Sequence, residues 1–164
     1  MKRAVDQDHW SRDEVSPERR RLCGALACLP ALSACKPEPR YIRLDLVTFS
    51  YWNRPIFDVF INGEGGDDAP AYPATNDSPM FSLPLVLGPQ YVTFRLGGQE
   101  GMQRYGATVI AKNVPQLIDV SPTAKYLGVH VYPDETVEFI PTLDFPSQTA
   151  KGRAMAAAAE ARYQ

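Results

Sequence analysis

The sequence predicts a mainly β protein, an antiparallel β-sandwich with a short C-terminal helix. Six segments between residues 41 and 146 alternate apolar with polar residues, which is the period of a strand that buries one face. Gly, Pro and Asn residues separate these segments at the short intervals typical of sandwiches and barrels. Only the segment 147–164 is rich in Ala, the residue with the highest helix propensity.

Residues 1–35 have the order of a lipoprotein signal peptide. Arg19–Arg21 precede the apolar stretch Leu22–Ala31, which is too short to span a membrane. The tetrapeptide that ends at Cys35, LSAC, resembles a bacterial lipobox, which implies cleavage after Ala34 and a lipid on Cys35. The competing interpretation is a buried apolar helix of a cytosolic domain.

A boundary at residue 35 sets the composition of the remaining chain. The leader holds 6 of the 17 Lys and Arg residues and 5 of the 19 Asp and Glu residues, so residues 36–164 carry 11 basic and 14 acidic side chains. This mildly acidic balance disfavours nucleic acid as a partner. All three cysteines lie in residues 1–35, so we expect no disulfide framework in the domain. Val15 is an alternative translation start, because it would leave a short basic n-region.

A Pro-rich tether, residues 36–40, leads into the sandwich domain, residues 41–146. In the first strand, residues 41–49, Ile42, Leu44 and Leu46 alternate with polar residues, which predicts one buried face. A second strand ends at Asn62-Gly63, a strong turn signal. The sequence MFSLPLVL, residues 80–87, predicts a third strand.

The second half of the domain predicts two more strands and a hairpin. The strands lie within residues 91–98 and 105–112. Residues 126–143 form the hairpin, with its turn at Pro133–Thr136. The last segment, 147–164, is interpreted as a helix capped by Ser147 or as a frayed tail, and Gly152 weakens its start.

The widest predicted loop is residues 62–78. Loops longer than about 12–15 residues are usually functional or disordered, and this one is acidic and contains an aromatic residue. The neighbouring turn 51–54 contributes Trp and Arg, which are enriched at interface hot spots. The competing interpretation is a core position for the Trp and a capping role for the Arg. The candidate partner-binding residues are Trp52, Arg54, Glu64, Asp67, Asp68 and Tyr72.

The pattern predicts neither an enzyme nor a cofactor or metal site. His130 is the one histidine after the leader, and the sequence has no G-x-S-x-G motif to supply a nucleophile, so we expect a surface or cross-strand histidine. The acidic residues of the 62–78 loop lack the spacing of a calcium loop. The tetrapeptide GEGG lacks the following Lys and Ser/Thr of a phosphate-binding loop.

Three segments resemble a family of bacterial lipoproteins. They are Tyr51–Gly63, which resembles the family pattern Y-x-x-R-x-I-x-x-F-x-V/I-N-G but has Val59 at the Phe position, Ser82-Leu83-Pro84, and Tyr126–Val137, with a Y-x-x-x-H-x-Y/F-P-D-x-x-V pattern. Many members of this family are similar to immunity proteins of type VI secretion phospholipase effectors. The Gly/Cys-rich block that precedes S-L-P in that family is absent here, where Pro79-Met80-Phe81 stands instead.

The resemblance implies an immunity lipoprotein that binds and inhibits a phospholipase effector in the periplasm. It carries over no catalytic residue. A lipid anchor on Cys35 would keep the inhibitor beside the membrane that the enzyme attacks, which raises its effective concentration. By the same resemblance, Lys36 after the Cys favours the outer membrane over the inner one. The alternative function is a structural or ligand-binding envelope lipoprotein without a toxin partner.

Overall fold

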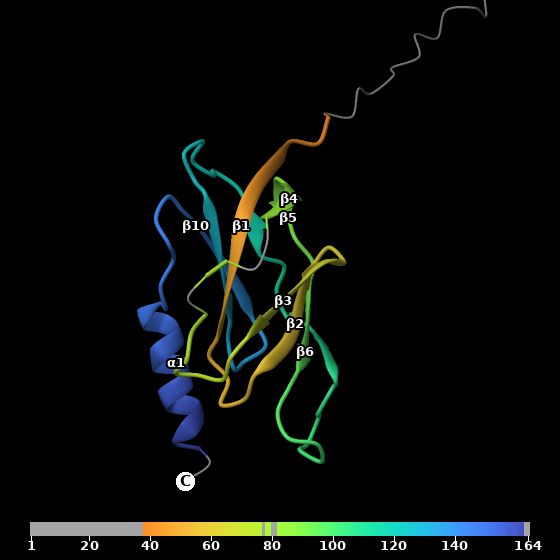
Figure 1. Ribbon diagram of the computed structural model, residues 1–164, viewed down its shortest axis with the longest axis vertical. Helices are drawn as coiled ribbons and strands as arrows, with labels where there is room; N and C mark the ends of the chain where they lie inside the picture. The colour runs from red at the N-terminus through yellow and green to blue at the C-terminus, as the bar shows by residue number, and fades with distance from the viewer. Residues whose placement is uncertain (1–37, 77, 80–81, 163–164) are drawn as a thin grey trace, which may run out of the picture. The chain divides into compact units, whose positions relative to one another are not determined.

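Ten strands and one helix form in the part of the chain that the computed structural model describes, residues 38–76, 78–79 and 82–162 (Figure 1). The predicted mainly β architecture with a short C-terminal helix is confirmed. The predicted signal peptide with Cys35 and the first two residues of the predicted tether lie outside the described residues. The elements are β1 (Tyr41–Ser50), β2 (Ile56–Ile61), β3 (Glu64–Ala69), β4 (Ser82–Val86), β5 (Gly88–Pro89), β6 (Val92–Leu96), β7 (Thr108–Ile110), β8 (Gln116–Leu117), β9 (Tyr126–Val131), β10 (Val137–Thr142) and α1 (Ala150–Glu160).

The strands form two four-stranded sheets and one small ribbon. Sheet A has the order β10-β9-β1-β4, sheet B has the order β3-β2-β6-β7, and β5 pairs with β8. The main core lies between the sheets: Leu44, Leu46 and Val129 come from sheet A, and Val59 and Phe94 from sheet B. The alternating pattern of the sequence therefore places its apolar side chains on the two facing surfaces.

One pairing departs from the prediction, because β1 and β9 run parallel. Their register extends from Asp45 opposite Tyr126 to Ser50 opposite Val131. The other pairings are antiparallel, including the predicted β9–β10 hairpin. Because all of sheet B lies between β1 and β9 in the chain, no tight turn fixes their direction. The antiparallel prediction is wrong for this one pair.

Strand β1 buries both of its faces beyond Leu46, although its sequence predicted one buried face. Val47, Phe49 and Tyr51 form a second cluster with Tyr132 and Ala156, on the outer surface of sheet A. Helix α1 covers this surface (Figure 1). The domain therefore has three layers where α1 lies: sheet B, sheet A and the helix.

The helix begins at Ala150, and its N-cap is Thr149 rather than the predicted Ser147. The Thr149 hydroxyl accepts a hydrogen bond from the Gly152 amide at 3.0 Å. Gly152 is buried against the ring of Tyr51, and a Cβ atom at this position would lie closer than 3.0 Å to three ring carbons. The glycine that weakens the helix in isolation is thus the residue that lets it approach the sheet.

Residues 62–78 do not form one long loop. Asn62 and Gly63 have φ values of 54° and 83°, which fits a two-residue hairpin turn, and β3 follows at once. β3 pairs with β2 and places Ala69 opposite Ile56. The prediction of a continuous loop is wrong for residues 64–69, because a short strand rich in Gly and Asp lacks the apolar alternation that marks strands in a sequence.

Candidate functional site

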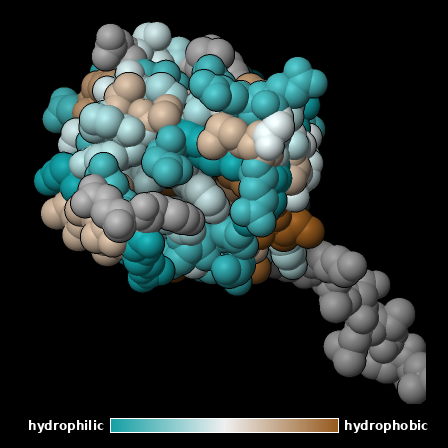
Figure 2. Space-filling model, turned by 90° about the horizontal axis from the view of Figure 1, so that it is seen from below, coloured by the Kyte–Doolittle hydropathy of each residue, from teal (hydrophilic) through white to brown (hydrophobic). Residues whose placement is uncertain are grey.

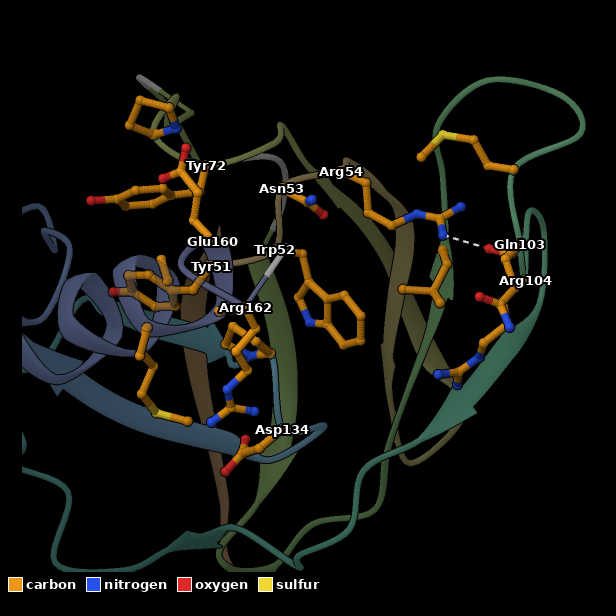
Figure 3. Close-up of a pocket in the computed structure, with 18 residues that line it drawn as sticks. Tyr51, Trp52, Asn53, Arg54, Tyr72, Gln103, Arg104, Asp134, Glu160 and Arg162 are labelled. Carbon is orange, nitrogen blue, oxygen red and sulfur yellow. Dashed lines mark hydrogen bonds between the residues drawn. The ribbon is translucent and has the colours of Figure 1, made fainter. Parts of the chain in front are cut away.

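A cleft of about 820 Å³ opens at the end of the domain where β1 ends. Its walls come from the turn 51–54, Tyr72-Pro73, the loop after β6, the β9–β10 turn and one side of α1 (Figure 3). Polar side chains surround a hollow on this face of the molecule (Figure 2). The volume is within the range of about 300–1,000 Å³ that is usual for ligand pockets.

Trp52 lies in the centre of the cleft (Figure 3). Its side chain is half-buried and packs on the main core, with its ring centroid 6.4 Å from that of Phe94. The indole Nε1 is buried and has no acceptor among the described residues. Trp52 thus has both of the positions considered for it. One part of its side chain contacts the core, and another part lies in the wall of the cleft.

Arg54 forms another wall and is only 8% exposed. Its Nε donates to the carbonyl oxygen of Gly97 at 2.7 Å, and one terminal nitrogen donates to that of Gln103 at 2.7 Å. The other terminal nitrogen also donates to Gly97. These bonds fasten the loop after β6 to the turn after β1. A cap and an exposed contact were the two interpretations of Arg54, and most of its surface is already covered by this loop.

Tyr72 connects the two segments that the sequence predicted to adjoin each other. Its amide donates to the carbonyl oxygen of Trp52 at 2.8 Å, and its ring centroid lies 6.1 Å from that of Tyr51. The side chain is half-buried and lines the cleft. The structure therefore brings Trp52, Arg54 and Tyr72 together at one site.

The three acidic candidates lie outside the cleft, on β3. Glu64 and Asp68 are exposed, and Asp68 lies near the end of the strand that pairs with Ile56, beside the turn 51–54. Asp67 is 2% exposed, and the Thr48 hydroxyl donates to its Oδ2 at 2.5 Å. Burial raises the pKa of Asp67 to about 6. The prediction of Asp67 as a surface contact is wrong, because its side chain points into the sandwich and joins β3 to β1.

His130 is buried rather than on the surface, although its cross-strand position is confirmed. Its ring stacks on Phe49 with centroids 4.9 Å apart, and its Nδ1 lies 3.0 Å from the Tyr51 hydroxyl. On the paired strand β10, Glu138 is directly opposite. Burial lowers the pKa of His130 to about 4, so the ring is neutral at pH 7.

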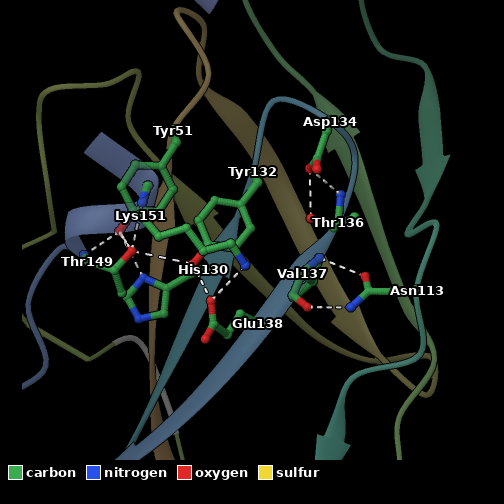
Figure 4. Close-up of polar contacts among 11 residues, drawn as sticks. Tyr51, Asn113, His130, Tyr132, Asp134, Thr136, Val137, Glu138, Thr149 and Lys151 are labelled. Atoms are coloured by element: carbon green, nitrogen blue, oxygen red, sulfur yellow. Dashed lines mark hydrogen bonds and ion pairs between the residues drawn. The ribbon is translucent and has the colours of Figure 1, made fainter. Parts of the chain in front are cut away.

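A polar network that the sequence did not reveal connects His130 to the helix (Figure 4). The Tyr51 hydroxyl accepts from the Thr149 amide at 2.7 Å, and the Tyr132 hydroxyl donates to Glu138 at 2.5 Å. Lys151 lies 3.1 Å from Glu138. These bonds and the ion pair lower the pKa of Glu138, while burial raises that of Tyr132. The contacts attach the first turn of α1 to sheet A, which positions the helix wall of the cleft.

Sequence reasoning also missed the cleft residues that come from the loop after β6 and from α1. Met102, Gln103, Met155 and Ala159 line the cleft together with the predicted Trp52. The available signals were weak: a Gly-bounded segment, residues 97–106, and one Met in an Ala-rich helix. Neither signal indicates by itself which surfaces face each other.

The described residues contain no group of three or more His, Cys, Asp or Glu side chains placed to hold a metal ion. None of the helices in the described ranges is long and apolar enough to cross a membrane. Comparison of the chain with protein-family models, curated proteins and solved structures finds no match.

Proposed function

We propose that this protein is an immunity lipoprotein of the periplasm, anchored through Cys35, that binds and inhibits a type VI secretion phospholipase effector. In this proposal it is a binding protein, not an enzyme, and it uses no cofactor and no nucleic acid. The support from the sequence is the lipobox and the family resemblance of Tyr51–Gly63, Ser82–Pro84 and Tyr126–Val137.

The observation that carries the proposal is the meeting of Trp52, Arg54 and Tyr72 at one cleft. Aromatic residues and Arg are the side chains most enriched at interface hot spots, and hot spots occupy partly enclosed positions. A protruding side chain of a partner would fit the cleft, and the surrounding polar side chains would form the rim. The cleft is held by strands and by the bonds of Arg54, so the partner meets a preorganised surface.

The direction of β1 favours the same surface. The chain enters the domain at Tyr41, and β1 runs for ten residues, about 30 Å, to Ser50 (Figure 1). The next residue, Tyr51, lines the cleft. An anchor on Cys35 would leave only the tether 36–40 between the lipid and the start of this strand. The cleft therefore lies at the opposite end of β1 from Tyr41, where the chain enters the domain.

The exposed acidic residues of β3 have a secondary role in this proposal. Glu64 and Asp68 lie on the surface, so they steer a basic partner and increase the association rate more than the final affinity. Asp67 has no part in the contact, because it is buried and bonded to Thr48.

The test is a titration of the lipase encoded next to this protein with the wild type and four variants. Trp52→Ala and Tyr72→Ala should each weaken inhibition, on the order of 1–3 kcal/mol for an anchor residue. Glu64→Ala with Asp68→Ala should give a smaller loss that disappears at high salt. Tyr91→Ala is the matched control, because Tyr91 is 68% exposed and lies outside the cleft. A thermal melt of each variant confirms that it is folded.

Two results would contradict the proposal. If the folded Trp52 and Tyr72 variants inhibit as well as the wild type, the interface lies elsewhere. If the wild type neither binds nor inhibits the lipase, the immunity function is wrong. The alternative, a ligand-binding envelope lipoprotein, then takes its place, and the cleft volume is the observation that favours it.

A further inference from the structure

The guanidinium of Arg54 is a buried cation whose charge no described carboxylate balances. The four ion pairs formed by the described residues involve other side chains. Each nitrogen of Arg54 donates one hydrogen bond to a backbone carbonyl, yet each terminal nitrogen carries a second N–H group. The described residues provide no acceptor for either of these two groups. A buried charge without a counterion is costly, so this position favours an anion.

The other charged groups that line the cleft do not occupy this position. Arg104 is paired with Glu135 at 2.7 Å, and Oδ1 of Asp134 accepts two bonds from Thr136. Asp134, Glu160 and Arg162 lie on the opposite side of Trp52 from Arg54 (Figure 3). Arg54 is therefore the cleft residue at which a negative group of a ligand would gain most.

Several apolar side chains line the same cleft as Arg54. Trp52 lies in the middle of the cleft (Figure 3). Met102 contributes to the lining from the loop after β6, and Met155 and Ala159 contribute from α1. Methionine side chains are flexible and adapt to the shape of an apolar ligand. A volume of about 820 Å³ accommodates a single hydrocarbon chain. The cleft thus offers a cationic group together with several apolar side chains.

We infer that the cleft binds a single-chain fatty acid. The carboxylate lies at Arg54, where its two oxygens accept hydrogen bonds from the two remaining N–H groups. The hydrocarbon chain lies over Trp52 toward Met155. A carboxylate fits because the guanidinium offers donors and charge together, and a hydrocarbon chain fits because Trp52, Met102, Met155 and Ala159 line the same cleft. This binding does not depend on the immunity function, and its test uses no effector.

The experiment measures the fluorescence of Trp52 in the full chain. The chain has two tryptophans, so Trp10→Phe leaves Trp52 as the only one. Dodecanoate is titrated at pH 8 below its micelle-forming concentration, and dodecanol is the matched neutral probe. We expect a saturable change with dodecanoate and binding at least about tenfold weaker for dodecanol. Decanoate should bind more weakly than dodecanoate, by up to about fourfold per methylene group removed.

Three variants separate the contributions of charge, apolar wall and fold. Arg54→Met should abolish the preference for dodecanoate over dodecanol. Arg95→Met is the control, because Arg95 is paired with Asp58 outside the cleft and its loss should not change the preference. Ala159→Phe should fill the helix side of the cleft and weaken both probes at least tenfold without touching the bonds of Arg54.

The inference is overturned by any of three outcomes. One is the absence of a saturable signal with dodecanoate, and another is equal binding of dodecanoate and dodecanol by the unmutated cleft. The third is a folded Arg54→Met variant that keeps the preference, which would leave Arg54 only a role in holding the loop. If Arg54→Met does not fold, the comparison of the two probes and the Ala159→Phe variant still decide the question.

Discussion

Replacing Gly152 with Ala tests whether α1 lies directly on the ring of Tyr51. In an isolated helix this change is favourable, by up to about 1 kcal/mol, because Ala has the higher helix propensity. In the folded protein the new methyl group would lie closer than 3.0 Å to three carbons of the Tyr51 ring. The two effects have opposite signs, so the measured stability shows which one is larger.

The Tyr51 ring cannot easily retreat from the added methyl group. It is 1% exposed, it stacks on Tyr132 with centroids 5.2 Å apart, and its hydroxyl lies 3.0 Å from Nδ1 of His130. The helix must therefore move outward. That movement stretches the 2.7 Å bond from the Thr149 amide to the Tyr51 hydroxyl and exposes Ala156.

The expected result is a net loss of stability. Overpacking a well-filled site costs about 1–3 kcal/mol, and loss of the Thr149 hydrogen bond adds about 1 kcal/mol. After the gain of up to about 1 kcal/mol in helix propensity, Gly152→Ala should lower the free energy of unfolding by about 1–3 kcal/mol. Urea unfolding followed by circular dichroism measures this difference.

Two further variants make the measurement specific to the contact. Ala157→Gly alters an exposed helix position outside the cleft and should cost about 1 kcal/mol through propensity alone. Combining Gly152→Ala with Tyr51→Ala should remove most of the clash, so the two changes should be strongly non-additive. If Gly152→Ala is as stable as the wild type or more stable, the close packing of α1 on Tyr51 is refuted.

The pH dependence of stability and the anchor give the remaining predictions. The folded pKa of Asp67, about 6, is above its ordinary value of 3.8. The stability that Asp67 contributes to the fold is therefore fully present below about pH 4 and is lost as the pH rises through 6. Between pH 4 and pH 8, the free energy of unfolding of Asp67→Asn should rise relative to that of the wild type by on the order of 1–2 kcal/mol. The folded pKa of His130, about 4, is below its ordinary 6.5, so its contribution is present above pH 6.5 and lost toward pH 4, and His130→Gln should flatten that loss. Urea unfolding from pH 4 to pH 8 measures both, and profiles parallel to the wild type would contradict them. Cys35→Ser should leave residues 1–34 uncleaved or release the protein from membranes, and a variant of normal mass in the membrane fraction would disprove lipidation.

Several features of the fold could be predicted from local sequence. Alternation of apolar and polar residues located the major strands, and Asn62-Gly63 located the turn of the β2–β3 hairpin. The Ala-rich segment located the helix. These features depend on side-chain period and backbone preference within a few residues, which a sequence displays directly.

The tertiary structure decided where those elements meet. The parallel pairing of β1 with β9, the burial of Asp67 against Thr48 and the role of Gly152 all depend on contacts between residues far apart in the chain. An acidic residue in a Gly-rich stretch has the same local sequence whether it faces solvent or the interior. Only the packing of two sheets and a helix determines that, because burial is a property of the neighbours that surround a residue and not of the residue itself.

The cleft illustrates the same division. The sequence indicated Trp52, Arg54 and Tyr72 as recognition residues, and the amide of Tyr72 bonded to Trp52 places their two segments side by side. Met102 and Met155 complete the site from a loop and a helix that no sequence pattern connects. Residue chemistry alone selected the side chains suited to binding, whereas the balance of charge around Arg54 exists only once the chain is folded, because it depends on which carboxylates lie near the guanidinium and which do not.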